Sequence, residues 1–100
     1  MKVRELSPAV AELDQAPGYY GRIQTRLARA LLHEVQAAKQ SIMRFPLAWK
    51  PLPGGLRSFS LNRFPYALIY QPSPEEILII AYAHLRRKPG YWRERWPGTH

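Results

Sequence analysis

The spacing of the apolar residues changes halfway along this chain, and that change constrains the fold more than any other feature. Between Leu27 and Phe45, apolar side chains recur every three or four residues, which is the period of one face of an α-helix. From residue 56 onward they alternate with polar residues or run continuously, as is typical of strands. We therefore expect an α+β domain whose helices lie in the first half of the chain.

The first half should form a two-helix hairpin over about residues 8–45. Ser7-Pro8 favours a helix start, because a serine hydroxyl caps free N–H groups and proline has none to leave free. Pro17-Gly18 should break or kink the first helix. Phe45-Pro46 should end the second, because the residue before proline avoids the helical region.

The second half should form a small, mainly antiparallel sheet of 3–4 strands over about residues 56–84. Strands are expected at 56–61, 65–71 and 77–83, and Val3–Leu6 could add to the edge of this sheet. Residues 46–55 contain three prolines and two glycines, which predicts a loop. The helical hairpin should cover one face of the sheet, with a basic, aromatic tail at 85–100, so that residues 1–100 form a single domain.

The composition favours a polyanion or an acidic protein as partner. Fifteen Lys and Arg against seven Asp and Glu give a formal net charge of +8. Most of the basic residues are arginines, whose planar fork pairs with phosphate or carboxylate. The chain has no cysteine, which excludes disulfides and thiolate metal sites. No apolar run is long enough for a membrane helix, so we expect a cytoplasmic protein without membrane, metal or cofactor.

Several residues could carry function, each with a structural alternative. His84 could exchange a proton with a substrate, or it could be a hydrogen-bonded histidine at a strand end. The aromatic residues of the tail could stack on bases, anchor a protein interface, or fold back over the core. The basic residues could line one positive groove or remain solvated at a sheet edge. The candidates for contacts with a target or phosphate are Arg57, Arg63, Arg86, Arg87, Lys88, Trp92, Arg93 and Arg95.

Three strings in the second half resemble a known family. RFPY at 63–66, AYAH at 81–84 and RRKPGYW at 86–92 are similar to the C-terminal half of RelE/ParE-type toxins of bacterial type II toxin–antitoxin systems, often labelled plasmid stabilisation proteins. Leu6-Ser7-Pro8 and Tyr19-Tyr20 fit the same family.

This resemblance implies a growth-inhibiting toxin that forms a hetero-oligomer with an acidic antitoxin. ParE-like members poison DNA gyrase by protein contact, and RelE-like members cut mRNA on the ribosome; a shared fold does not choose between them. We favour the ParE-like activity, which is not enzymatic, because the second predicted strand lacks the lysines that ribosome-directed relatives often use. A RelE-like nuclease would rely on His84, Arg87 and Tyr91. A third alternative is a non-toxic, degenerate antitoxin-binding module, which only the Pro17-Gly18 break supports.

Overall fold

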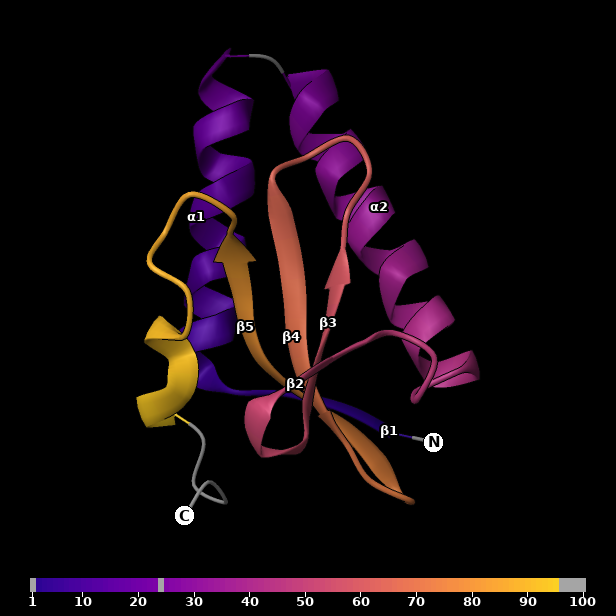
Figure 1. The fold of residues 1–100 in the computed structure, drawn as a ribbon. Helices are drawn as coiled ribbons and strands as arrows, with labels where there is room; N and C mark the ends of the chain where they lie inside the picture. The colour runs from indigo at the N-terminus through magenta and orange to yellow at the C-terminus, as the bar shows by residue number, and fades with distance from the viewer. Residues whose placement is uncertain (1, 24, 96–100) are drawn as a thin grey trace.

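Two helices cover one face of a five-stranded sheet, as Figure 1 shows. The computed structural model describes residues 2–23 and 25–95, and for residues 16–23 the backbone alone. Trp96, in the expected tail, lies outside the described residues. In chain order the elements are β1 (Lys2–Glu5), α1 (Ser7–Ile23), α2 (Thr25–Arg44), β2 (Lys50–Leu52), a short 3-10 helix η1 (Pro53–Gly55), β3 (Leu56–Ser60), β4 (Tyr66–Pro72), β5 (Glu76–His84) and a second 3-10 helix η2 (Tyr91–Arg95).

The sheet has five strands in the order β1-β5-β4-β3-β2, not the 3–4 strands expected. β1 pairs with β5 in parallel and the other pairs are antiparallel, so the sheet is mixed. The unexpected strand is β2, which lies in the segment predicted to be a loop. Its Pro51 is tolerated because β2 is an edge strand, where one side of the backbone needs no donor. β1 also precedes the helices, so the helical pair is not the first element of the chain.

Of the break or kink expected at Pro17-Gly18, the break does not occur, because α1 continues through these residues to Ile23. Proline removes one backbone hydrogen bond and disfavours a helix interior. α1 nevertheless packs against both α2 and β5, and tertiary packing of this kind provides most of the stability of helices in proteins.

The apolar stripe of α2 faces the sheet as predicted, except at its last member. Leu31, Val35, Ala38 and Ile42 are buried. Phe45 is 56% exposed, because α2 ends at Arg44 and the helical period no longer directs the next side chain inward. Helix spacing therefore predicts burial only as far as the helix extends.

Buried side chains lie on both faces of the sheet. On the face covered by the helices, Leu68, Tyr70 and Ile79 pack with α2. On the opposite face, here called the tail face, Ile69 and Ile80 pack with side chains that include Trp92 of the tail. β5 is buried on both sides, which explains its continuous apolar sequence.

The tail, here residues 85–95, is fastened to the body by Glu12 of α1. The Glu12 carboxylate accepts hydrogen bonds from the Tyr91 hydroxyl and from the Arg95 guanidinium, the latter at 2.8 Å. It also accepts from the backbone N–H of Tyr82 in β5 at 3.1 Å, and Arg87 lies 3.3 Å from it. One side chain thus links α1, β5 and both ends of the tail.

The part of the chain that the structure describes contains neither a metal-binding cluster nor a membrane-spanning helix. No group of three or more His, Asp or Glu side chains there could hold a metal ion. No described helix is long and apolar enough to cross a membrane.

The packing of α2 predicts that truncating two adjacent leucines has very different effects on stability. Leu31 is 1% exposed and Leu32 is 43% exposed. Leu31→Ala should lower the free energy of unfolding by about 2–5 kcal/mol, because it leaves a cavity in the core. Leu32→Ala, the matched control, should change it by about 0.5 kcal/mol or less. Urea unfolding followed by circular dichroism measures both, and equal losses would contradict the register of α2.

The anchoring of the tail predicts that Glu12→Gln loosens it. The change keeps the shape of the side chain but removes the charge that faces Arg87 and Arg95. Since hydrogen bonds to charged groups contribute roughly 1.5–3 kcal/mol each, we expect a loss of stability of that order. We also expect faster trypsin cleavage after Arg93. Glu94→Gln removes the same charge from an exposed side chain and serves as control. Unchanged proteolysis and unchanged unfolding of Glu12→Gln would contradict this role.

Candidate functional site

The tail folds back over the sheet through a turn that requires a glycine. Gly90 has a φ of +82°, a backbone conformation that residues with a Cβ rarely adopt. A Cβ at this position would also lie 3.1 Å from Nε of Arg93. The turn leads directly into η2, whose Tyr91 and Trp92 pack against the tail face. The aromatic part of the tail therefore covers the core, which was one of the alternatives expected for Trp92.

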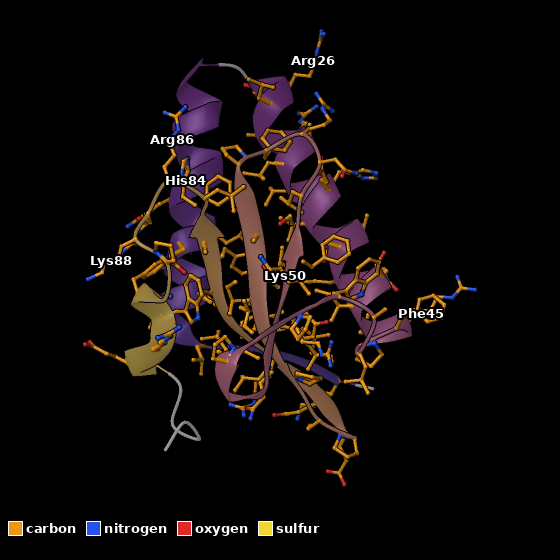
Figure 2. All side chains as sticks on the ribbon, viewed as in Figure 1. Arg26, Phe45, Lys50, His84, Arg86 and Lys88 are labelled. Carbon is orange, nitrogen blue, oxygen red and sulfur yellow. The ribbon has the colours of Figure 1, made fainter. Side chains whose placement is uncertain are left out.

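A hollow of about 220 Å³, here called the tail-face hollow, lies between the sheet and the tail. Its polar side chains are Lys50, Ser58, His84 and Arg87, and Trp92 forms part of its wall. Lys50 is paired with Ser58 across β2 and β3, so the two strands carry these side chains together. The small side chains of β4 and β5 beside them leave the space open. Figure 2 shows Lys50 in front of the sheet and His84 at the end of β5.

His84 is held in one orientation by its neighbours. The backbone N–H of Arg86 donates to Nδ1 of His84 at 3.1 Å, and the imidazole ring meets the Tyr66 ring edge-on, with centroids 5.0 Å apart. Because Nδ1 accepts this bond, the proton of the neutral imidazole lies on Nε2. In this tautomer Nε2 can donate a hydrogen bond, and Nδ1 is occupied by the Arg86 N–H.

The Tyr91 side chain is engaged by Glu12 and Arg87. Its hydroxyl donates to Glu12, and the Arg87 guanidinium stacks on its ring at 3.7 Å. Burial, and then the hydrogen bond to the Glu12 carboxylate, raise the pKa of Tyr91 well above its ordinary value. Its hydroxyl is therefore a structural donor rather than a group that readily ionises.

The basic side chains of the tail differ in their ion pairing and in their exposure to solvent. Arg95 is 18% exposed and forms a bidentate pair with Glu12, and this hydrogen bonding raises its pKa further. Arg87 shares Glu12 but remains 53% exposed. Among the described residues, Arg86, Lys88 and Arg93 are exposed and form no ion pair. The tail therefore presents a few free cations beside the hollow, and Figure 2 shows Arg86 and Lys88 on this side of the molecule.

Arg57 does not lie with these residues. It is opposite Tyr70 in the β3–β4 pairing, on the face that the helices cover, and it donates to the backbone oxygen of Trp49 at 2.8 Å. Tyr70 donates to the backbone oxygen of Pro46, and burial raises its pKa to about 12. Both side chains thus fasten the segment that follows α2.

Arg63 is also separate from the hollow. It lies in the turn between β3 and β4, beside Arg26, Arg29 and His33 of α2. The expected positive groove that would unite Arg57, Arg63 and the tail is therefore not assembled. Arg57, Arg63 and the cations of the tail lie in three separate places instead.

Sequence reasoning did not place two residues in this region. Lys50 was the nearest candidate for a lysine base or phosphate clamp but was set aside because it was assigned to a loop, and the pairing of β2 with β3 brings it to the hollow. Glu12 was not singled out, because nothing local distinguishes a helical glutamate that meets a tail some 80 residues later. The excess of cations in the tail was the available signal that an acidic side chain should meet it.

No family model matches the sequence, and a search of curated proteins found no match. Among solved structures, the chain is similar to one described as "Chromosomal ParDE TA system from P. aeruginosa". The TM-score is 0.75 with 19% sequence identity, and the match covers 86% of this chain and 97% of that chain. The chain therefore has the fold of a protein of a ParDE system over most of its length.

Proposed function

We propose that this chain is the toxin of a type II toxin–antitoxin pair, with a ParE-like mode of action. The observation that carries the proposal is the near-complete structural likeness to a chain of a ParDE system. It coincides with the strings at 63–66, 81–84 and 86–92 that resemble RelE/ParE-type toxins. Neither observation depends on the other, because the structural likeness holds at 19% identity.

The state of the site favours inhibition by protein contact over RNA cleavage. Attack by a ribose 2′-hydroxyl needs a general base, and Nδ1 of His84 is occupied by the hydrogen bond from the Arg86 N–H. Tyr91 and Arg95 are engaged by Glu12 and are not free for a substrate. What remains accessible is a set of cationic side chains around an apolar wall, a combination that suits a protein interface. The target that we propose is DNA gyrase.

The hollow gives one specific reason to keep the RelE-like alternative. Lys50, His84 and Arg87 border the same space, and a lysine and an arginine there could hold a phosphate beside the imidazole. This arrangement would work as a nuclease only if the bond from Arg86 N–H to His84 were broken during catalysis. The third alternative, a degenerate module, loses its support because α1 is continuous through Pro17-Gly18.

The partner that we propose is an acidic antitoxin that covers the tail face. The chain carries a net +8, and Leu85 is an exposed apolar side chain at the rim of the hollow. A flexible acidic segment could neutralise Arg86, Lys88 and Arg93 and bury this apolar surface at the same time. The resulting hetero-oligomer would act in the cytoplasm, where both candidate targets are found.

The proposal predicts that expression of the chain without its antitoxin stops growth by arresting DNA replication. Incorporation of labelled thymidine should fall before incorporation of labelled methionine, and the DNA-damage response should be induced. An early loss of protein synthesis with cleaved mRNA would contradict the ParE-like hypothesis and support the RelE-like one. Normal growth at a demonstrated level of folded protein would overturn the toxin proposal.

The second prediction is that His84→Ala leaves toxicity largely intact. A gyrase poison needs no proton transfer from this side chain, whereas a nuclease that used it would lose about 10²–10⁴-fold in rate. The measurement compares growth arrest at equal expression for wild type, His84→Ala and Gln40→Ala, an exposed change on α2 away from the hollow. Loss of toxicity in a folded His84→Ala protein, with Gln40→Ala still toxic, would contradict the protein-contact mechanism.

A further inference from the structure

A second concave and basic surface lies on the helix side of the molecule, away from the tail face. It is an open groove between the first half of α2 and the turn that joins β3 to β4, with a volume of about 580 Å³. Its basic lining residues are Arg26, Arg29, His33 and Arg63. We name it the α2 groove. Figure 2 shows Arg26 extending from the beginning of α2, well separated from Lys88 of the tail.

The basic side chains form a row along one wall. Arg26, Arg29 and His33 follow one another at intervals of three and four residues, so they project from the same side of α2. At about 1.5 Å per residue, this row extends roughly 10 Å along the helix axis. Arg63 faces the row from the opposite wall of the groove.

The turn that carries Arg63 is fastened to α2. Oε1 of Glu34 accepts hydrogen bonds from the backbone N–H groups of Asn62 and Arg63, the second at 3.1 Å. These bonds hold the turn against α2 through the backbone of Arg63, whose guanidinium lies over the Phe64 ring, 5.7 Å from the ring centroid, and forms no ion pair with a described residue. The groove is therefore preformed and does not need a ligand to assemble it.

Among the described residues, the three arginines of the groove form no ion pair, and their positive charges outnumber the one negative charge of Glu34 in the lining. The single acidic residue of the lining, Glu34, has one carboxylate oxygen occupied by the turn. Three unpaired guanidinium groups in one concavity repel one another, and a bound anion relieves that repulsion.

We propose that the α2 groove binds the phosphate backbone of double-stranded DNA. The row on α2 is long enough for its arginines to contact neighbouring phosphates along one strand of a duplex. Arginine donates to phosphate oxygens in a planar fork, which fixes the duplex without reading its bases. The binding should therefore be independent of sequence and strongly dependent on salt.

The lining argues against three other anionic ligands. Among the residues whose side chains the structure describes, the lining contains no Phe, Tyr or Trp on which unpaired bases could stack, which disfavours single strands. Double-stranded RNA is read largely through contacts to 2′-hydroxyls across a wide minor groove, for which a short row of guanidinium groups is poorly suited. An acidic peptide would need apolar contacts besides charge, and the apolar lining consists of two alanines.

The inference does not depend on the toxin proposal, because the groove and the tail-face hollow have no lining residue in common. The chain could contact DNA through the α2 groove while its tail face holds an antitoxin or a target. DNA binding by the isolated chain tests the groove, whereas toxicity tests the tail face. Either proposal can therefore be contradicted while the other stands.

The experiment measures fluorescence anisotropy of a labelled DNA duplex titrated with the full chain over a series of salt concentrations. The wild-type protein should bind, and Arg26→Gln/Arg29→Gln should weaken binding by about tenfold or more. The slope of log affinity against log salt should fall by about 2, since each lost phosphate contact contributes about 1. Arg63→Gln alone should lower this slope by about 1.

The matched control is Lys2→Gln/Arg44→Gln, which removes the same charge from exposed positions outside the groove. It should retain wild-type affinity to within about threefold, because distant surface charges are largely screened. Circular dichroism checks that each variant is folded. Equal losses in the two double variants would overturn the proposal, since diffuse charge would then explain binding. So would absence of binding to the duplex, or tighter binding to single strands, to double-stranded RNA or to polyglutamate.

Discussion

The tail face depends on the carboxylate of Glu12. Its side chain is 12% exposed and meets two guanidinium groups, a phenol hydroxyl and the backbone N–H of Tyr82. A carboxylate buried to this degree would destabilise the fold if it stood alone, and its four partners offset the loss of hydration. The same contacts decide the orientation of Arg87 and Tyr91, and they hold Trp92 against the sheet. The shape of the tail-face hollow therefore follows from one residue on the first helix.

The elements that could be predicted from the sequence are those whose signal is local. α2 has a clear helical period, and β3, β4 and β5 carry alternating or continuous apolar residues. β2 could not be predicted, because three residues with a central proline form a strand only when β3 lies beside them. For α1, the sequence left open whether the helix breaks or only kinks at Pro17-Gly18. The local cost of Pro17 was evident, but the packing of α1 against α2 and β5 that offsets it is not local.

The candidate site divides in the same way. His84 and the cations that follow it lie close together because they are neighbours in the chain. Arg57 was expected to join them, yet it shares a strand face with Phe59 and Leu61, and both of these pack into the core beneath the helices. The alternation of side chains along a strand therefore already predicted that Arg57 points away from the tail face. The positions of Lys50 and Glu12 depend on contacts between distant parts of the chain: the pairing of β2 with β3, and the bonds between α1 and the tail.

The separation of the cations has a physical consequence for how one small domain can meet two partners. At physiological ionic strength, the interaction between exposed charges decays over about 8 Å. The molecule measures 40 × 27 × 21 Å, and the sheet lies between the tail face and the helix side. Neutralising the tail cations with an acidic antitoxin should therefore leave the field of the α2 groove nearly unchanged. If all the arginines lay in one groove, an acidic protein and DNA would compete for it, whereas under the two proposals made above the separate surfaces would allow both to bind at once.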